Sequence, residues 1–316
     1  MEKKHPNFHY CILKGILRHL RRIPYYLIKP ILWSIGHTDT AKYWEAKRAY
    51  KNVLKHIKWA DADYSEYNIP IADIDSDNTI WIYWKQGIEN APQIVKKCIA
   101  SVSKYNKDYR VIIVDSKNIH SYVKFPKRIE ELHNKGMFSE AHFSDLLRLQ
   151  LLILYGGIWI DATVLVTADM PEIVRRSPFF MFSVGNWWPS MKDPSKCSSW
   201  FIKSNSNNKL LVKTRNFLFE HWKHRISLIH YFAFHYALSA LCDTDIECQL
   251  IWNDVPFIST LQPHYLQFNF GRKYDKASYD YTLSQCFVHK CTYKYKPALL
   301  TQPQENFLQH LLKDTP

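Results

Sequence analysis

Residues 137–167 read MFSEAHFSDLLRLQLLILYGGIWIDATVLVT, and this stretch decides the fold. Apolar residues fill most positions of 139–155, which predicts a helix buried inside the protein. Two glycines follow and end the helix, because glycine readily takes the left-handed conformation of a helix C-cap. The next run, Ile-Trp-Ile at 158–160, predicts a short buried strand that ends at Asp161. Open α/β sheets bind ligands at the carboxyl ends of their strands, so Asp161 is a candidate site residue.

Two charged residues, Asp145 and Arg148, interrupt the apolar helix. They lie three residues apart and share one face, which must open on a partner or on a polar cleft because an unpaired buried charge is costly. From the residues alone two interpretations stay open. The stretch is a core helix with an internal ion pair, or it delivers an acidic strand end that holds a divalent cation against a phosphate, since such cations prefer oxygen ligands.

A third interpretation is a family resemblance. The order Ser144-Asp145, then Arg148, then Leu-Tyr-Gly-Gly-Ile-Trp-Ile-Asp-Ala-Thr over 154–163 resembles the central signature of the family 32 sugar-nucleotide glycosyltransferases and the related capsular polysaccharide synthesis proteins. This resemblance decides between the interpretations. It implies a GT-A type α/β fold, with a Rossmann-like, mostly parallel sheet flanked by helices, in a hexosyltransferase that depends on a nucleotide sugar.

Length and composition fit a globular α/β protein. The chain has 316 residues, of which 47% are hydrophobic and 22% charged, and it can bury a substantial core in one large domain with additions or in two small ones. Its seven cysteines are scattered, odd in number and without a CxxC pair, so the sequence indicates neither a zinc site nor a disulfide framework. A reducing cytoplasm fits this cysteine usage best.

Positive charge is concentrated near the N-terminus. Residues 1–60 hold 13 lysines and arginines against three acids, and so ten of the thirteen net positive charges of the chain. Within them, 10–36 is basic and amphipathic, its apolar runs are too short and interrupted to span a bilayer, and it lacks the features of a cleavable signal. We expect it to bind an anionic membrane surface as an interfacial anchor. A solvated helix packed on the main domain and a nucleic-acid-binding arm are the alternatives.

The sequence divides into three parts. Residues 1–60 are predicted to be a basic, helical, membrane-associating extension, with a further helix over 39–60. Residues 61–78 are rich in Asp, Ser, Asn and Pro and are predicted to be a linker. The glycosyltransferase domain is predicted to occupy 79–316. Within it, 182–208 is rich in Trp, Ser, Asn and Lys, which favours a long surface loop over the site.

The domain is predicted to open with a βαβ unit. β-Branched and aromatic residues fill 79–84 and predict a buried strand. The apolar spacing of 92–105 predicts a helix with proline in its first turn, and 109–114 predicts a second strand that ends on Asp115. This order argues for a right-handed crossover and a parallel sheet. No GxGxxG or GxxxxGK sequence occurs, so neither the usual dinucleotide fold nor a P-loop is indicated.

The same segment resembles the opening strand and turn of the family, where the nucleotide of the donor is bound. The resemblance implies that Trp84, Gln86 and Gly87 line the nucleotide pocket. It also implies that Asp115 faces the uridine of a UDP-linked donor. From the residues alone, Trp84 equally fits the core, and Asp115 equally fits a cap of the helix that follows it.

The resemblance also implies roles for the charged residues of the central stretch. It implies that Asp145, Arg148 and Asp161 are the catalytic residues, and that the first two contact the donor sugar and its phosphates. Asp161 matches the first acid of the family's Asp-x-Asp metal motif, which implies a divalent cation, Mn²⁺ or Mg²⁺. The chain departs from this motif at Thr163, where a hydroxyl replaces the second carboxylate and is a weaker ligand for such a cation.

Residues 287–294, FVHKCTYK, resemble the terminal His-Lys segment of the family. The resemblance implies that His289 approaches the metal and the diphosphate, so the expected metal ligands are Asp161, Thr163 and His289. It implies that Lys290 compensates phosphate charge, because preplaced cations stabilise a leaving nucleoside diphosphate. From the residues alone, a solvated basic tail is the alternative.

Two further histidines lie in the apolar segment 210–242, which has helical spacing. His230 and His235 belong to the triplets HYF and FHY and are five residues apart. They do not share a helix face, which argues against a histidine metal site there.

We therefore expect a transferase that moves a hexose from a UDP-linked donor to a hydroxyl of a lipid-linked oligosaccharide, with retention, in bacterial capsular or surface polysaccharide synthesis. Its expected place is the cytoplasmic face of the plasma membrane, as a peripheral protein, in an oligomeric state that the sequence does not predict. A non-catalytic membrane-associated scaffold is the alternative, although it leaves Asp145, Arg148 and His289 without a role. No nucleic-acid partner is expected, because the positive charge is crowded into one amphipathic segment instead of a groove-sized face.

Overall fold

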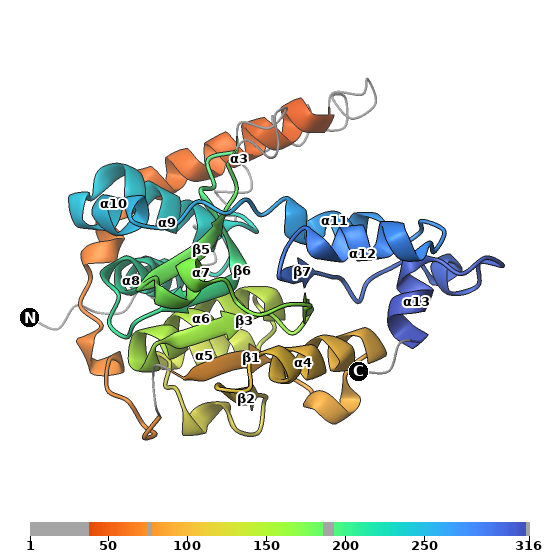
Figure 1. Cartoon of the computed structure of the whole chain (residues 1–316). Helices are drawn as coiled ribbons and strands as arrows, with labels where there is room; N and C mark the ends of the chain where they lie inside the picture. The colour runs from red at the N-terminus through yellow and green to blue at the C-terminus, as the bar shows by residue number, and fades with distance from the viewer. Residues whose placement is uncertain (1–37, 75–77, 186–192, 314–316) are drawn as a thin grey trace, which may run out of the picture.

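The structure is a computed structural model that describes residues 38–74, 78–185 and 193–313. The basic segment 10–36, predicted to bind a membrane surface, lies outside the described residues. Over the described ranges, no helix has both the length and the apolar character needed to cross a bilayer. The described chain forms a central sheet with helices around it and a smaller C-terminal group of helices to one side (Figure 1).

A five-stranded sheet forms the centre of the molecule. Its strands are β1 (Thr79–Tyr83), β2 (Arg110–Val114), β3 (Gly157–Ile160), β5 (Phe179–Ser183) and β6 (Cys197–Ser204), arranged in the order β2-β1-β3-β6-β5. β1 pairs in parallel with both β2 and β3, whereas β6 runs antiparallel between β3 and β5. Four strands therefore run in one direction and β6 is reversed, which confirms the predicted α/β class with a mostly parallel sheet.

A two-stranded sheet joins the end of the central stretch to the C-terminal part of the chain. β4 (Val164–Val166) pairs antiparallel with β7 (Val288–Lys290), in a register that sets Val164 opposite Lys290. The chain that leaves β3 is thereby tied to a strand from near the C-terminus.

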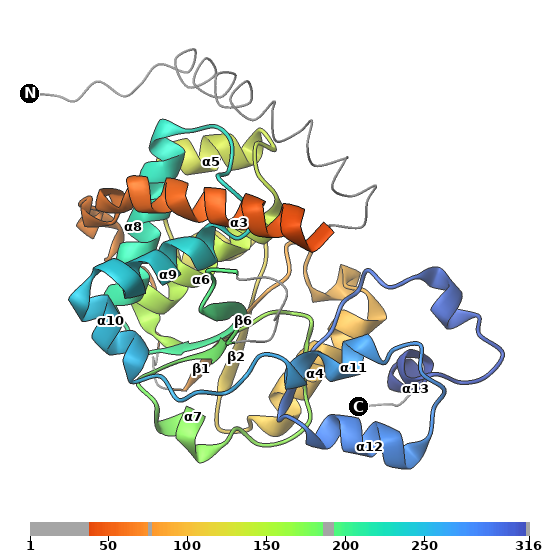
Figure 2. The same cartoon turned by 90° about the horizontal axis from the view of Figure 1, so that it is seen from above.

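Helices cover both faces of the sheet. α4 (Gln93–Tyr105) covers one face, and α6 (Glu140–Tyr155), α8 (Lys209–His224) and α9 (Ala233–Thr244) cover the other, with α3 (Thr38–Lys55) packed on α9 (Figure 2). The other α-helices are α5 (Lys127–Asn134), α7 (Glu172–Arg176), α10 (Ile246–Asn253), α11 (Tyr265–Phe268), α12 (Lys276–Ser284) and α13 (Phe307–Lys313). Short 3₁₀ helices occupy Ile57–Asp61, Ser65–Tyr67, Ile88–Asn90, Ile119–Ser121, Gln262–His264 and Pro297–Leu300.

The alternation of side chains along the strands divides the core into two clusters. Ile80 and Ile82 of β1 lie in the cluster with α4, whereas Trp81 lies in the cluster with α6, α8 and α9. Trp81 also donates from its indole to the carbonyl of Gly156 at 3.0 Å. β1 is thus fastened to the turn that precedes β3, at the centre of the sheet.

α6 is the buried helix that the sequence predicts. It begins after Ser139, whose hydroxyl accepts a hydrogen bond of 3.3 Å from the amide of His142, and it ends at Gly156, which has a φ of +67°. A Cβ at Gly156 would lie 2.8 Å from the amide nitrogen of Ser206, so the turn needs glycine for space as well as for conformation. From His142 onward the helix is buried except at Ser144.

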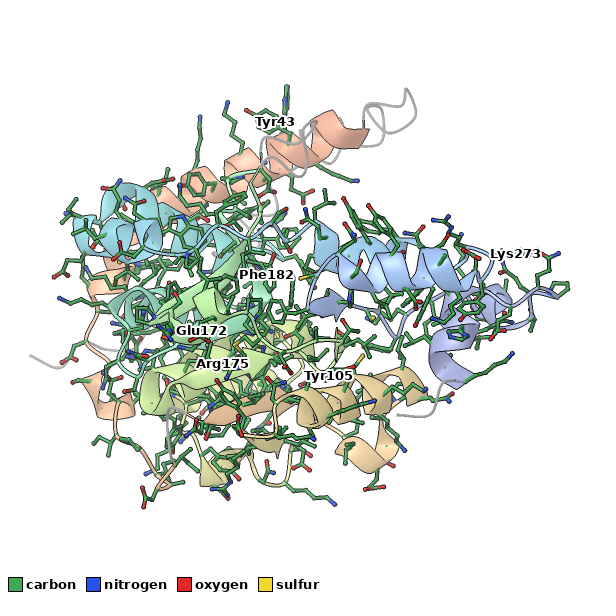
Figure 3. The ribbon with its side chains drawn as sticks, in the orientation of Figure 1. Tyr43, Tyr105, Glu172, Arg175, Phe182 and Lys273 are labelled. Atoms are coloured by element: carbon green, nitrogen blue, oxygen red, sulfur yellow. The ribbon has the colours of Figure 1, made fainter. Side chains whose placement is uncertain are left out.

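The predicted surface loop over 182–208 contains the buried strand β6, so that prediction is wrong. Phe182, labelled in Figure 3, stacks on Trp200 of β6 with 4.5 Å between the ring centroids. The polar residues of the strand are accommodated by partners inside the protein: the hydroxyl of Ser198 donates to that of Thr260 at 2.7 Å. A polar composition therefore does not place this segment on the surface.

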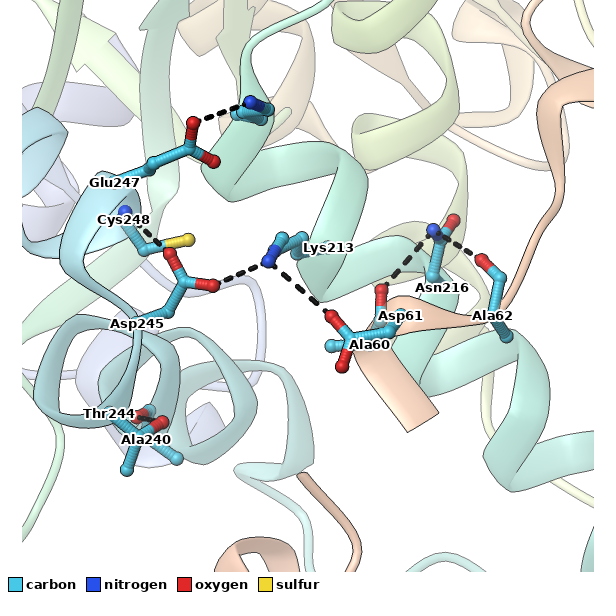
Figure 4. Close-up of polar contacts among 11 residues, drawn as sticks. Ala60, Asp61, Ala62, Lys213, Asn216, Ala240, Thr244, Asp245, Glu247 and Cys248 are labelled. Atoms are coloured by element: carbon cyan, nitrogen blue, oxygen red, sulfur yellow. Dashed lines mark hydrogen bonds and ion pairs between the residues drawn. The ribbon is translucent and has the colours of Figure 1, made fainter. Parts of the chain in front are cut away.

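The described part of the predicted extension and linker packs on the domain. α3 buries the small or apolar residues Ala46, Ala49 and Val53. Farther along, Asn216 of α8 donates to the carbonyl of Ala62 at 2.8 Å, and Lys213 of α8 forms an ion pair with Asp61 at 3.4 Å (Figure 4). Because these contacts bury apolar area and satisfy backbone groups, the described residues before β1 are continuous with the folded domain.

Candidate active site at the carboxyl edge of the sheet

A cavity of about 830 Å³ opens where β1 and β3 end. Its wall includes Tyr83 at the end of β1 with residues 84–86 after it, one face of α6 between Glu140 and Arg148, residues 161–163 after β3 and residues 290–294 at the end of β7. Small-molecule sites typically have volumes of about 300–1,000 Å³. The cavity lies at the edge of the sheet where ligands of open α/β sheets bind.

Two acids and two cations alternate along the wall of this cavity. Arg148 forms ion pairs with Asp145 (Nη1 to Oδ1, 2.8 Å) and with Asp161 (Nη2 to Oδ1, 3.2 Å). Lys290 donates from Nζ to the other carboxylate oxygen of Asp161 at 2.9 Å, and to Thr163 Oγ1 at 2.6 Å. The structure thus brings together five residues for which the sequence predicts a role in the site.

Arg148 is fixed by contacts besides its ion pairs. Its Nη2 donates to Ser144 Oγ at 2.9 Å, one turn earlier on α6. Its guanidinium carbon lies 5.0 Å from the ring centroid of Trp159, in a cation–π contact. The indole of Trp159 in turn donates to Asp161 Oδ1 at 2.9 Å. The helix and the strand joined by the glycine turn therefore build this network between them.

Asp161 is ionised at neutral pH. Burial alone would raise the pKa of its carboxyl group. The charges of Lys290 and Arg148, with the hydrogen bonds from Lys290 and Trp159, outweigh burial and hold that pKa below its usual range. Asp161 therefore faces Lys290 and Arg148 as a carboxylate at neutral pH.

A buried histidine, His142, lies behind Asp145. Its Nε2 accepts a hydrogen bond of 2.8 Å from the indole of Trp222, which can only donate. In the neutral ring the proton is then on Nδ1, which lies 3.6 Å from Asp145 Oδ2. Sequence reasoning gave His142 no role, because its partner comes from α8, 80 residues later.

Tyr231 and His235 also line the cavity, and sequence reasoning missed both as site residues. Tyr231 is 65% exposed on the cavity wall. Burial lowers the pKa of His235 to about 4, so its imidazole is neutral at pH 7, and within the described residues its Nδ1 has no hydrogen-bond partner. The signal for both residues is the pair of triplets HYF and FHY in an otherwise apolar segment.

The residues predicted to line a nucleotide pocket divide into two groups. Trp84 and Gln86 line the cavity, whereas Gly87 and Asp115 lie outside its lining. Asp115 accepts a hydrogen bond of 2.7 Å from the amide of Lys117, so its carboxylate caps the turn that follows β2. The alternative from the sequence was a cap of the helix that follows, but the N-cap of that short helix is Asn118, and Asp115 instead turns its carboxylate toward its own backbone.

His289 does not line the cavity, so the structure does not bring it together with the other predicted site residues. It is fully buried, and its Nε2 lies 3.1 Å from both the carbonyl oxygen of Leu283 and Thr167 Oγ1. Burial lowers the pKa of His289 to about 4. Successive side chains of a strand point to opposite sides, so Lys290 faces the cavity and His289 faces away from it.

The residues at this edge do not fit the divalent cation that the family resemblance implies. Asp161 is the one carboxylate among the three predicted ligands, and its two oxygens already accept from Arg148 and Lys290. The hydroxyl of Thr163 accepts from the same lysine. In the part of the chain that the structure describes, no group of three or more His, Cys, Asp or Glu side chains is arranged to hold a metal ion.

Comparison with known proteins gives a family match over most of the chain. The family model described as "Capsular polysaccharide synthesis protein" matches residues 31–311. Among solved structures, a PaToxG glycosyltransferase is similar with a TM-score of 0.35 and 16% sequence identity, over 68% of this chain and 83% of that one.

Three curated fungal proteins with similarity to this chain carry glycosyltransferase names. O-glycosyltransferase braB of Annulohypoxylon truncatum is 36% identical over 98 residues, 28% of this chain and 23% of that protein. O-glycosyltransferase PaGT of Phomopsis amygdali is 27% identical over 108 residues (31% and 27%), and glycosyltransferase afumC of Aspergillus fumigatus is 28% identical over 134 residues (40% and 31%). The chain therefore spans less than a third of the length of each of these relatives.

Proposed function

The chain belongs to the capsular polysaccharide synthesis protein family, and on that basis we propose that it is a glycosyltransferase that moves a hexose from a nucleotide sugar, a UDP-sugar, to an acceptor hydroxyl. The observation that carries this proposal is the position of Arg148 and Lys290 together on the cavity wall. Fixed cations suit a diphosphate, because its negative charge grows as the glycosidic bond breaks. The glycosyltransferase names of the curated relatives support the same class.

Different parts of the cavity suit different parts of the donor. Trp84 and Gln86, at the end of β1, offer an aromatic ring and an amide to the nucleoside. Arg148 and Lys290 offer charged N–H donors to the diphosphate. Asp145 offers a carboxylate that accepts hydrogen bonds from the sugar hydroxyls. The donor then lies with its anomeric carbon near α6, and its nucleoside toward the edge of the sheet.

The proposed reaction breaks the bond between the anomeric carbon and the diphosphate, and the bonding electrons stay on the diphosphate. A new bond forms between the anomeric carbon and the acceptor oxygen, and the acceptor proton passes to the leaving diphosphate. Asp145 and Asp161 are both held in ion pairs, which makes them poor nucleophiles. We therefore favour attack from the same face as the leaving group, with retention of configuration and no covalent enzyme intermediate.

The acceptor and its setting are proposed from the sequence. We propose a hydroxyl of a lipid-linked oligosaccharide, at the cytoplasmic face of a bacterial plasma membrane, because ten of the thirteen net positive charges lie in residues 1–60. Sedimentation with vesicles that contain anionic lipid tests this setting. Replacing Arg18, Arg21 and Arg22 by Gln should weaken vesicle binding, and unchanged binding would contradict the proposed anchor.

A thermal-shift screen with UDP-, GDP- and CDP-sugars tests the function. At a ligand concentration one hundred times its Kd, a ligand stabilises the folded chain by about 2.7 kcal/mol, which raises Tm by roughly 5 °C. We expect UDP-sugars alone to have this effect and Asp161→Asn to abolish transfer in a chain that still folds. A non-catalytic scaffold would respond to none of the three classes. Turnover at the wild-type rate in Asp161→Asn would refute the assignment of the site.

A further inference from the structure

We propose that the ammonium group of Lys290 takes the place of the divalent cation at this site, so that the chain binds the diphosphate of its donor without a metal. This inference rests on the proposed transferase function and deepens it. It follows from a disagreement between sequence and structure. The family resemblance implies a metal held by Asp161 and Thr163, and the structure shows the Lys290 ammonium in contact with both.

Lys290 occupies the position where the metal was expected. Its Nζ lies 2.9 Å from Asp161 Oδ2 and 2.6 Å from Thr163 Oγ1. An ammonium group has three N–H donors, and these two contacts use two of them. Because Lys290 also lines the cavity, its third N–H can donate to an oxygen of a bound diphosphate.

The backbone holds the lysine at this position. Lys290 is the last residue of β7 and lies opposite Val164 of β4, and the amide of Cys291 donates to the carbonyl of Thr163 at 2.8 Å. Its side chain is 20% exposed. A cation fixed on a paired strand is preorganised, so little rearrangement is needed when negative charge develops on the leaving group.

The charges around Asp161 disfavour a metal ion and suit an anion. Its Oδ1 accepts from Arg148 at 3.2 Å and from Trp159 at 2.9 Å, and its Oδ2 accepts from Lys290. A divalent ion here would share one carboxylate with two cations that repel it. A diphosphate would meet the same two cations with their N–H donors already directed at the site.

The hydroxyl of Thr163 suits a lysine partner better than a carboxylate would. A carboxylate at this position would form a second ion pair with Lys290 and cancel its charge. A hydroxyl accepts the hydrogen bond and leaves the positive charge for the ligand. The Asp-Ala-Thr sequence is therefore consistent with an ammonium group in the site, and its departure from Asp-x-Asp has a structural reason.

UDP binding to the full-length chain, measured by calorimetry in excess EDTA and again in Mn²⁺, tests the proposal, with GDP and CDP in parallel. We expect the wild-type Kd for UDP to be the same in both buffers within about twofold. Lys290→Gln should raise that Kd about 10- to 100-fold in EDTA, and Lys290→Arg should retain most of the affinity because it keeps the charge. The control Lys107→Gln removes an exposed charge before β2, away from the cavity, and should leave the Kd unchanged.

Two further measurements examine the metal directly. A Mn²⁺ titration of the wild-type chain, followed by electron paramagnetic resonance without nucleotide, should show no tightly bound ion. The double variant Thr163→Asp with Lys290→Gln rebuilds two acids at 161 and 163 without the lysine. Its UDP binding should be weak in EDTA and should recover in Mn²⁺, because the metal then supplies the missing positive charge.

Two results would overturn the proposal for Lys290 while leaving the transferase assignment in place. One is wild-type UDP binding that is lost in EDTA and restored by Mn²⁺. The other is an unchanged Kd in Lys290→Gln. A folded wild-type chain that binds none of UDP, GDP and CDP in either buffer would instead remove the proposed function, and this inference with it.

Discussion

Arg148 forms ion pairs with Asp145 and Asp161 on the cavity wall, and its replacement tests how much these pairs contribute to stability. Arg148→Met removes the guanidinium and keeps an apolar side chain in its place. The lost contacts are two ion pairs, at 2.8 Å to Asp145 and at 3.2 Å to Asp161, together with the hydrogen bond to Ser144 Oγ and the cation–π contact with Trp159. Hydrogen bonds to charged groups contribute about 1.5–3 kcal/mol each, so the structure predicts a loss of roughly 3–6 kcal/mol. Removing one partner of a buried ion pair costs about 3–5 kcal/mol, which agrees with this predicted loss of stability.

A double-mutant cycle with Asp145→Asn gives the sharper test. In Arg148→Met, the carboxylate of Asp145 is left buried without its main partner, and this accounts for much of the cost. Asp145→Asn removes that charge. We therefore expect the double variant to be more stable than Arg148→Met alone, by about 1–2 kcal/mol, although it carries one more substitution. Urea unfolding followed by circular dichroism measures the four proteins, with equal m-values as the criterion of comparable states.

The control for this cycle is Arg176→Met. Arg176 is an exposed residue of α7 that pairs with Glu172 along the same helix. An exposed pair contributes at most about 1 kcal/mol, so this variant should differ little from the wild type. Additive free energies in the cycle, or an Arg148→Met chain as stable as Arg176→Met, would refute the coupling between Arg148 and its acids.

Three other predictions follow from single positions. Gly156→Ala should lower the free energy of unfolding by more than Gly136→Ala in thermal melts, because both glycines have a positive φ but only the first would place a Cβ 2.8 Å from backbone. Stability should fall as the pH drops below about 4.5 toward 2. Burial raises the pKa of Glu220, but hydrogen bonds from His224 and Lys223 lower it from 4.5 to about 2. The stabilising effect of the Glu220 carboxylate is therefore complete above pH 4.5 and is lost as the pH falls toward 2. Urea midpoints at each pH check this, and Glu220→Gln should flatten the profile. Tyr231→Ala should reduce kcat/KM at least about tenfold in a transfer assay, because the ring lies on the cavity wall. The same change should alter the free energy of unfolding by less than about 0.5 kcal/mol, because the ring is largely exposed.

Local patterns predicted the first strands and helices closely. The strand predicted at 79–84 is β1 and the helix predicted at 139–155 is α6, each within one residue of its observed bounds. β-Branched runs, apolar periodicity and a glycine pair are signals that neighbouring residues carry. β6 was missed because its polar residues find partners far away in the sequence: Lys203 donates to the carbonyl of Ser177 at 2.5 Å. Composition alone cannot show such partners, and so it favoured a loop.

The candidate site shows the same difference between local sequence signals and contacts distant in the sequence. Asp145, Arg148 and Asp161 come together because a helix, a turn and a strand follow one another directly, and the sequence predicts all three elements. His289 and Lys290 are neighbours on β7. The register of β7 against β4 decides which of the two side chains points into the cavity. A shift by one residue would exchange their sides. The sequence carries no local signal for that register, so it could not show that Lys290, and not His289, contacts Asp161.

In the proposed transferase, the balance of charge in the cavity links folding to donor binding. Asp145 and Asp161 form ion pairs with Arg148 and Lys290 in the folded chain, and these pairs offset part of the cost of burying the cations. A bound diphosphate would accept from the third N–H of Lys290, while Asp161 continues to neutralise part of the positive charge of both cations. This partial neutralisation would weaken the hold of the cations on the product, and release of product often limits turnover in enzymes. We therefore expect Asp161 to have two opposed effects in the proposed reaction, because the carboxylate that keeps the Lys290 ammonium in place would also limit how tightly that ammonium retains the nucleoside diphosphate product.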